Sequence, residues 1–145
     1  MTILEIPSVA QIARESVARA GLADRIGCVA CDMFVDEWPV GCDAALLSHV
    51  VEVFSPARVE KLYKKAYESL PAGGRLFVWT ILANDEETGA LQAAKSSIYF
   101  LCVGSGEGMA HPAREHKELM KTAGFKSVKT YSAAEIDHGA IVATK

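Results

Sequence analysis

The sequence predicts an α/β protein with a mainly parallel sheet, and three observations support this fold class. Short apolar segments alternate with segments whose apolar residues recur at helical spacing, which is typical of sheets built from strand–helix–strand units. Segment 75–82, RLFVWTIL, is almost wholly apolar and predicts a central strand covered on both faces. Two strand-like segments that close the chain predict an antiparallel hairpin at one edge of the sheet.

Residues that begin and end helices set the boundaries of these elements. Ser8 is expected to cap the first helix, and Gly21 is expected to close it. Ser55 precedes Pro56 at the start of the next helix, an order that suits the N-cap and the first helical position. The expected order is strand 2–6, helix 8–20, strands 26–30 and 44–47, helix 56–70, strand 75–82, helix 87–103, loop 104–108, helix 112–123, and strands 126–131 and 139–144.

The composition is that of one globular domain, which we expect to span residues 1–145. Hydrophobic residues make up 50% of the chain and charged residues 23%. The net charge of −3 provides no basic surface for nucleic acid or anionic lipid. No apolar run approaches the roughly 20 residues that span a bilayer, and the first residues do not resemble a signal peptide. We therefore expect a cytoplasmic protein with no membrane span and no nucleic-acid partner.

The four cysteines do not have the spacing of a zinc site. Cys28 and Cys31 lie in a strand-like segment, where their side chains would point to opposite faces. A zinc knuckle would need both on a turn and a second pair downstream. The sequence therefore predicts buried free thiols at these two positions, with no metal site and no disulfide.

Polar residues follow the strand 44–47 and mark the candidate site for chemistry. Ser48 and His49 come directly after the strand, and Glu52 lies shortly before the next helix. Ligands of open α/β sheets bind outside the carboxyl ends of the strands, so these side chains are candidates for catalysis. A glutamate with a reference pKa of about 4.3 suits neutral base catalysis only if burial raises the pKa. Histidines have a more suitable intrinsic pKa, and His49, His111 and His138 are the alternatives.

Several motifs resemble the catalytic domain of the class I S-adenosylmethionine-dependent O-methyltransferases. They are LEIP near the start, CDMF after the second strand, the turn SLPAGG, and AGF before the late strands. The similarity covers nearly the whole chain and is to the branch that includes plant phenolic and bacterial small-molecule O-methyltransferases. The resemblance implies a Rossmann-like methyltransferase sheet, S-adenosylmethionine as cofactor, and methyl transfer to a hydroxyl of a small-molecule acceptor.

The resemblance also implies roles for individual residues. Glu5 falls where the family has an acidic residue that accepts hydrogen bonds from the cofactor ribose. Asp32 matches the acid that faces the adenine amine, and the side chain of Met33 would pack on the ring. Ser48 lies where plant members often place a lysine that faces the cofactor's carboxylate, and Glu52 stands at the position of the histidine general base.

The chain departs from the family pattern in ways that affect its expected function. It matches the family from the second strand onward, so the sheet is expected to be truncated at the N-terminus, without the first strand and its glycine-rich loop. Thr80 and Ala110 replace the two carboxylates that steady the base. We therefore expect a partial or split O-methyltransferase domain, completed as a homodimer or by a partner chain that supplies the missing strand and loop. The alternative is a non-catalytic remnant that acts as an interaction or dimerisation module.

Overall fold

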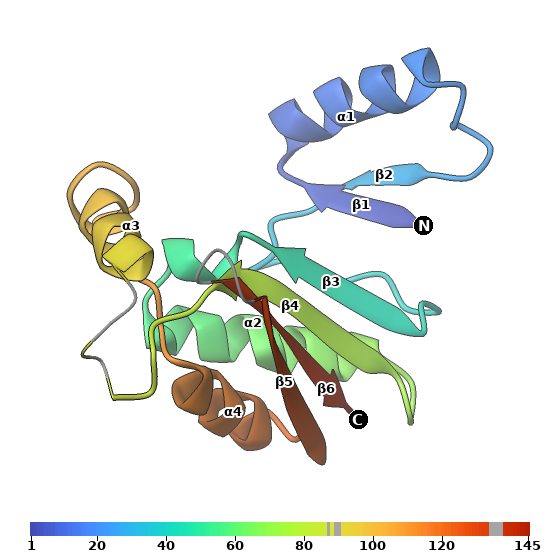
Figure 1. Cartoon of the computed structure of the whole chain (residues 1–145). Coiled ribbons are helices and arrows are strands. Elements are labelled where there is room, and N and C mark those ends of the chain that lie inside the picture. The colour runs from blue at the N-terminus through green and yellow to red at the C-terminus, as the bar shows by residue number, and fades with distance from the viewer. Residues whose placement is uncertain (87, 89–90, 134–137) are drawn as a thin grey trace.

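The computed structural model describes all residues except 87, 89–90 and 134–137, and its elements alternate as the sequence predicts (Figure 1). The elements are β1 (Thr2–Glu5), α1 (Pro7–Arg19), β2 (Gly27–Ala30), β3 (Ala44–Ser48), the short 3-10 helix η1 (Val51–Val53), α2 (Pro56–Ser69), β4 (Arg75–Ile81), α3 (Leu91–Cys102), α4 (Ala113–Thr122), β5 (Ser127–Ala133) and β6 (His138–Thr144).

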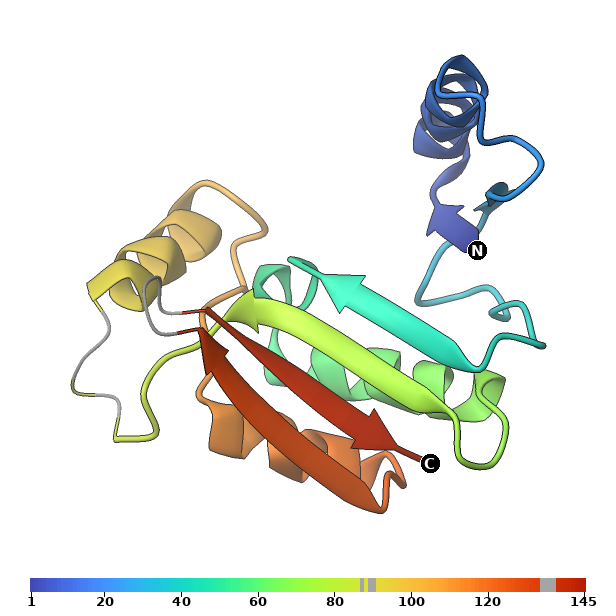
Figure 2. The ribbon, with the colours of Figure 1, turned by 45° about the vertical axis from the view of Figure 1, so that its right-hand side comes forward.

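The described strands form two sheets rather than one. β1 and β2 pair in parallel, and a separate four-stranded sheet has the order β3-β4-β6-β5. β3 and β4 are parallel, whereas β6 runs antiparallel to both of its neighbours. The predicted α/β class with a C-terminal antiparallel hairpin is confirmed. Figures 1 and 2 show β1, β2 and α1 set apart from the larger sheet, with β1 on the side nearer β3.

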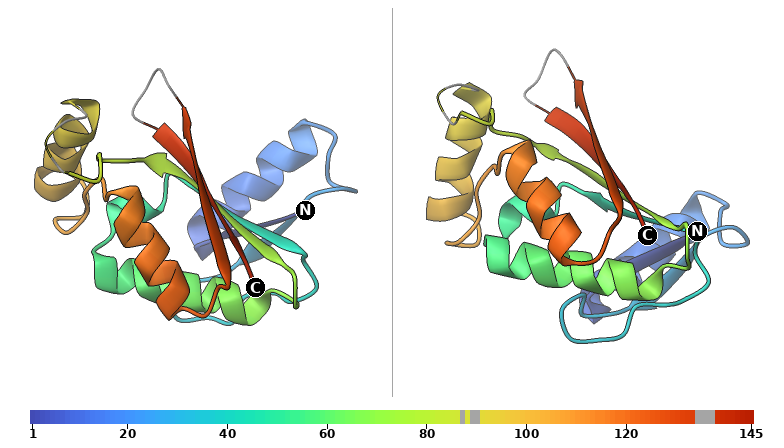
Figure 3. Two further views of the ribbon diagram at one scale, coloured as in Figure 1. Left: turned by 60° about the horizontal axis from the view of Figure 1, so that its bottom comes forward. Right: turned by 90° about the horizontal axis from the view of Figure 1, so that it is seen from below.

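The core lies on one face of the four-stranded sheet, where α2 and α4 cover it (Figure 3). Leu47, Val78 and Ile141 occupy neighbouring positions on this face and are buried. The opposite face is more open, because Leu46 is 67% exposed and its neighbour Phe77 is only partly buried. In the described part of the chain, α2 and α4 cover only one face of segment 75–82, and on the other face Ile81 alone is buried, beside Ala93 of α3, so the predicted cover on both faces is not found along the whole strand.

The N-termini of two helices differ from the predicted capping pattern. α1 begins at Pro7, directly after Ile6, so Ser8 lies inside the helix and is not its cap. Proline has a fixed φ and no N–H, which suits the first helical position. Ser55 does stand before α2, but its side chain makes no capping hydrogen bond. Gly21 follows α1 with a φ of 67°, as a helix-closing glycine does.

The remaining predictions concern the late helix and the cysteines. α3 is shorter than the predicted helix 87–103, and residues 87 and 89–90 lie outside the described part of the chain. All four cysteines are free thiols, with Cys31 buried and Cys28 partly buried. Among the described residues, no three His, Cys, Asp or Glu side chains cluster in a way that could hold a metal ion. No helix in the described ranges is long and apolar enough to cross a membrane.

Candidate active site

The candidate site begins where β3 ends and the chain turns sharply. His49 follows Ser48, the last residue of the strand, and has a φ of 52° in the left-handed region. Its backbone N–H donates to the Trp79 carbonyl oxygen at 2.9 Å, which extends the pairing with β4 by one step. A positive φ in a residue other than glycine is uncommon and marks a position that the surrounding structure fixes. The turn therefore holds the His49 ring at the carboxyl end of the parallel strands.

Glu52 connects this ring to β4 through two hydrogen bonds. Its Oε1 atom lies 2.8 Å from Nδ1 of His49, and its Oε2 atom accepts from the Thr80 hydroxyl at 2.8 Å. Glu52 is 1% exposed, whereas the His49 side chain is 47% exposed. A buried carboxylate needs such partners because burial removes its contacts with water. Glu52 thus fixes the orientation of a histidine that faces outward.

The His138 ring lies beside His49, and the Trp79 ring lies beside His138. The His138 ring centroid is 5.2 Å from that of His49 and 5.8 Å from that of Trp79. Both neighbours come from the more open sheet face, on β6 and β4. The exposed imidazole of His49 therefore stands beside an aromatic surface, of a kind against which an apolar or aromatic ligand can pack.

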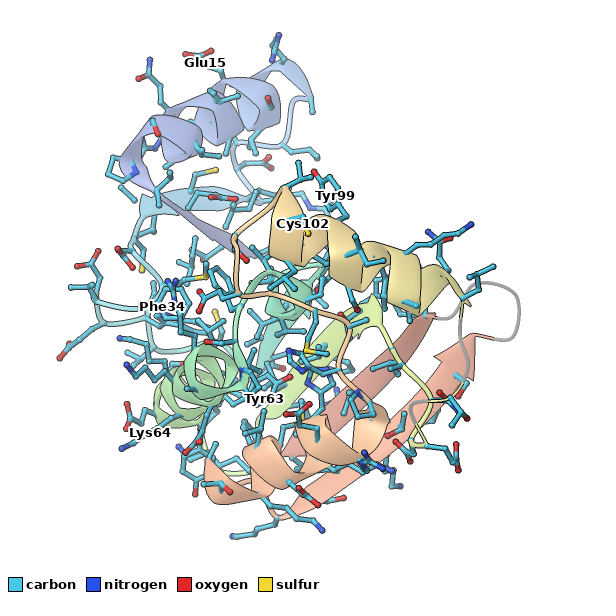
Figure 4. The ribbon with its side chains drawn as sticks, turned by 90° about the vertical axis from the view of Figure 1, so that its left-hand side faces the viewer. Glu15, Phe34, Tyr63, Lys64, Tyr99 and Cys102 are labelled. Carbon is cyan, nitrogen blue, oxygen red and sulfur yellow. The ribbon has the colours of Figure 1, made fainter. Side chains whose placement is uncertain are left out.

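The other histidines are buried and bonded within the core. His111 contacts Glu115 Oε2 at 2.9 Å and the Phe54 carbonyl oxygen at 3.3 Å through its two ring nitrogens. His116 shares a 2.7 Å hydrogen bond with the Tyr63 hydroxyl, and Figure 4 shows Tyr63 between α2 and α4. Burial, with a smaller contribution from His111, lowers the pKa of His116 to about 3. Burial likewise raises the pKa of Tyr63 well above its ordinary value. These groups stabilise the core and are poorly placed to meet a ligand.

The residues that the resemblance assigns to the cofactor lie at the ends of β1 and β2. Glu5 is the last residue of β1, and its carbonyl oxygen accepts the Cys31 N–H at 2.8 Å. Asp32 is exposed, and its Oδ1 atom accepts the Phe34 N–H at 2.9 Å, which shapes the turn. Met33 is partly buried and packs against the core. Glu5 and Asp32 thus present carboxylates at one end of a parallel strand pair, a position that suits recognition of hydroxyl and amine groups.

The structure gathers the predicted residues in two groups along one edge. Ser48, His49 and Glu52 lie together on the larger sheet, and Glu5, Asp32 and Met33 lie on the smaller one. In Figure 1 the arrowheads of β1 and β3 point to the same side, so both groups belong to carboxyl ends. No hydrogen bond between described strands joins β1 to β3. Sequence reasoning missed the Thr80 contact, although the spacing of His49 and Glu52 could have indicated that the two meet on a turn.

The sequence comparison decides the family. A family model for the O-methyltransferase domain matches residues 1–126. The chain belongs to the O-methyltransferase domain family. The predicted resemblance is thereby confirmed, and the family comprises S-adenosylmethionine-dependent methyltransferases of small molecules.

Individual relatives agree with this family over almost the entire chain. This O-methyltransferase domain is 36% identical over 147 residues to an L-tyrosine C(3)-methyltransferase of Streptomyces lavendulae, covering 99% of the chain and 40% of the relative. It is 31% identical over 142 residues to a 3-hydroxy-5-methyl-1-naphthoate 3-O-methyltransferase of Streptomyces sahachiroi, covering 98% of the chain and 41% of the relative. The chain therefore spans about 40% of the length of these relatives.

Solved structures match the fold over almost the whole chain. The apo S-adenosylmethionine-dependent methyltransferase SibL matches with a TM-score of 0.92 and 30% identity, over 99% of this chain and 42% of that one. An O-methyltransferase family 2 protein from Planctomyces limnophilus, in complex with apigenin, matches with a TM-score of 0.88 and 31% identity, over 99% and 43%. The matches cover 99% of this chain, β1 and β2 included, within proteins of more than twice its length.

Proposed function

We propose that this domain carries the proton-accepting part of a methyltransferase that acts on a hydroxyl group of a small molecule. The observation that carries the proposal is the hydrogen-bonded series of His49, Glu52 and Thr80 at the carboxyl ends of β3 and β4. Donation from Nδ1 to the carboxylate leaves Nε2 of His49 as the atom that accepts a proton. His49 then takes the proton of the acceptor hydroxyl, and Glu52 stabilises the resulting imidazolium as the carboxylate of a catalytic triad does.

This assignment gives Glu52 an indirect role. Both of its carboxylate oxygens already have partners, and the residue is 1% exposed, so an acceptor hydroxyl would reach His49 first. Glu52 orients the imidazole and selects its tautomer, while Thr80 holds the carboxylate from the other side. General-base assistance of this kind contributes roughly 10²- to 10⁴-fold in rate.

The residues at the ends of β1 and β2 fit the adenosine part of S-adenosylmethionine. Glu5 would accept hydrogen bonds from the ribose hydroxyls, and Asp32 would accept one from the adenine amine. Met33 would pack on the adenine ring, and the Ser48 hydroxyl would face the carboxylate of the methionine part. When bound, the cofactor supplies an electrophilic methyl group on sulfonium sulfur.

The active form is proposed to need a further segment of polypeptide. The chain spans about 40% of its relatives, and in the described part of the structure β1 and β3 face each other without pairing. A parallel strand between them would join the two sheets, and its following loop would lie at the same edge as the site. A longer chain, or a partner chain with the missing strand and glycine-rich loop, would supply it.

Transfer to a ring carbon is a second candidate reaction. The relative of 36% identity is an L-tyrosine C(3)-methyltransferase. Removal of a phenol proton by His49 would raise the nucleophilicity of the adjacent ring carbon as well as of the oxygen. After transfer to carbon, the methylated carbon loses its ring proton and the oxygen takes back the proton from His49, which restores the phenol and the neutral base. NMR of the product distinguishes an O-methyl from a C-methyl group.

Calorimetry and activity measurements test the proposal together. The purified chain is titrated with S-adenosylmethionine, alone and with the part of the Streptomyces sahachiroi relative that lies outside the matched region. We expect binding and methylation of a phenolic acceptor in the mixture, with Asp32→Ala weakening cofactor binding and His49→Gln lowering the rate. His111→Gln is the control for replacement of a histidine. The folded variant should transfer methyl groups at the wild-type rate. Absence of heat at millimolar ligand and of product in the mixture would contradict the proposal and favour a non-catalytic interaction module.

A further inference from the structure

The loop 104–108 lies directly on the turn that carries Glu52. Gly108 donates its N–H to the Ser105 hydroxyl at 3.0 Å, and the residue is buried. A Cβ atom at Gly108 would lie 2.6 Å from the Val53 carbonyl carbon, closer than real Cβ atoms approach. The backbone of the loop therefore packs against η1 without any intervening side chain, and movement of the loop would disturb the support of Glu52.

Glu107 fastens this loop to the start of α2. Its Oε1 atom accepts from Arg58 Nη1 at 2.8 Å. Hydrogen bonds from Ser55, followed by the bond from Arg58, lower the pKa of Glu107, so its carboxylate is charged at neutral pH. A carboxylate also suits this position because it faces the N-terminus of a helix. The loop is thus held by charge-assisted contacts that originate outside it.

Arg58 also contacts the turn that follows β2. Its Cζ atom lies 4.0 Å from the Phe34 ring centroid and 4.6 Å from that of Phe54. The two rings meet edge to face with centroids 4.9 Å apart, and Figure 4 shows Phe34 beside the N-terminal end of α2. A guanidinium held over aromatic rings gains a cation–π attraction and keeps one orientation. The Phe34 N–H donates a hydrogen bond to Asp32, the residue proposed to bind the adenine amine. Arg58 therefore also contacts the turn that carries the proposed adenine site.

We propose that Arg58 is a positioning residue that joins Phe34 to Glu107, holds the loop 104–108 on η1, and thereby keeps Glu52 in place beneath His49. Its use in catalysis rests on the proposed function, but the arrangement itself does not. The Arg58 side chain then connects the turn of the predicted adenine site with the loop 104–108, which packs on η1 and so supports Glu52 and the predicted base. The guanidinium reaches no reacting atom, so its effect is carried through Glu107 and Glu52.

Nitrogen NMR of the His49 imidazole in the whole chain tests this role without any ligand. At about pH 8 the wild-type ring should show one tautomer, with the proton on Nδ1. Arg58→Met and Glu107→Gln should both give a mixture of the two tautomers, because the loop 104–108 no longer holds the backbone of η1 that carries Glu52. Arg58→Lys keeps a cation for Glu107 and should stay close to wild type. Arg75→Met is the matched control, since Arg75 also lies over an aromatic ring, that of Phe77, at the opposite end of β4 from Thr80.

A purely structural role would lower the melting temperature and leave the tautomer ratio of the folded protein unchanged. An unchanged His49 spectrum in both Arg58→Met and Glu107→Gln would therefore overturn the proposal, as would a mixture of tautomers in Arg58→Lys or Arg75→Met. Glu107→Gln is nearly isosteric and keeps the test valid if Arg58→Met does not fold. These results do not depend on methyl transfer, so failure of the proposed function would be recognised separately.

Discussion

The Glu52 carboxylate lies 2.8 Å from Nδ1 of His49, and the two residues differ sharply in exposure, at 1% and 47% of their side chains. The carboxylate is therefore enclosed, while the imidazole faces outward. A buried acid that bonds to one nitrogen of an exposed histidine selects its tautomer and makes the other nitrogen the proton acceptor. The pair supports the proposal that His49 is the base in a chain with glutamate at position 52, where the family has a histidine.

Replacement of Glu52 by glutamine should reverse this tautomer. The amide oxygen can still accept from Thr80, which places the amide N–H₂ against Nδ1 of His49. The proton of the ring then moves to Nε2, and His49 can no longer accept one there. We expect methyl transfer by the completed enzyme to fall by about 10²- to 10⁴-fold, with cofactor affinity unchanged.

Thr80 provides the matched control for this prediction. Thr80→Ser keeps the hydroxyl that bonds to Glu52 and should retain activity, whereas Thr80→Val removes it and should lower activity less than Glu52→Gln does. Equal rates for wild type and Glu52→Gln would show that His49 is not the base.

The buried pair of Tyr63 and His116 should make the fold sensitive to acid. The pKa of His116 is lowered from 6.5 to about 3 in the folded state, so the unfolded chain binds one more proton between these values. The contribution of His116 to the free energy of unfolding is therefore complete above pH 6.5 and is lost as the pH falls toward 3. The loss is about 1.4 kcal/mol for each pH unit in this range. Urea unfolding between pH 4 and pH 7 measures it.

The double variant Tyr63→Phe with His116→Phe tests the origin of this slope. It removes both partners of the 2.7 Å hydrogen bond, which avoids leaving one of them buried and unpaired. The slope of stability against pH should flatten, whereas His138→Gln, at a partly buried residue on β6, should keep it. A double variant with the wild-type slope would refute the assignment to His116.

Most of the fold could be predicted from local sequence patterns, and the errors in the prediction have a common cause. Helical spacing located α2, and the apolar run located β4, since both depend on neighbours in sequence. The covering of β4 depends on which other elements reach its second face, and Phe77 remains partly open there. The start of α1 was also mispredicted. Ser8 has the better capping side chain, but the helix begins at Pro7, with Ile6 as the N-cap residue.

The site was predictable in position but not in its contacts. Glu52 and His49 were found because polar residues follow β3, yet sequence alone could not tell which would be enclosed. That depends on η1, whose single turn is too short to leave a periodic pattern. The contact of Arg58 with Glu107 joins residues that are 49 positions apart, and no local signal records such a pair.

Gly108 should not tolerate a side chain. An added Cβ would press on the carbonyl group of Val53 and on the backbone of Glu52, neither of which can move freely. We expect Gly108→Ala to lower the free energy of unfolding by about 1–3 kcal/mol and to disturb the His49 tautomer. Gly27→Ala is the control, because a Cβ there meets no atom within 4 Å. Equal stability of the two variants in urea would contradict the close packing of the loop on η1.

Leu46 should drive association of the isolated domain. It is 67% exposed on β3, which is the outermost strand of its sheet in the described part of the chain. An apolar side chain on an unpaired edge favours contact with another chain. We expect light scattering to show concentration-dependent association of the wild-type domain, and Leu46→Lys to reduce it while leaving the melting temperature nearly unchanged. Leu47→Lys, at a position that is 7% exposed and packed beside Val78, should unfold the domain instead. Association that is the same in wild type and Leu46→Lys would mean that the β3 edge is not the contact surface.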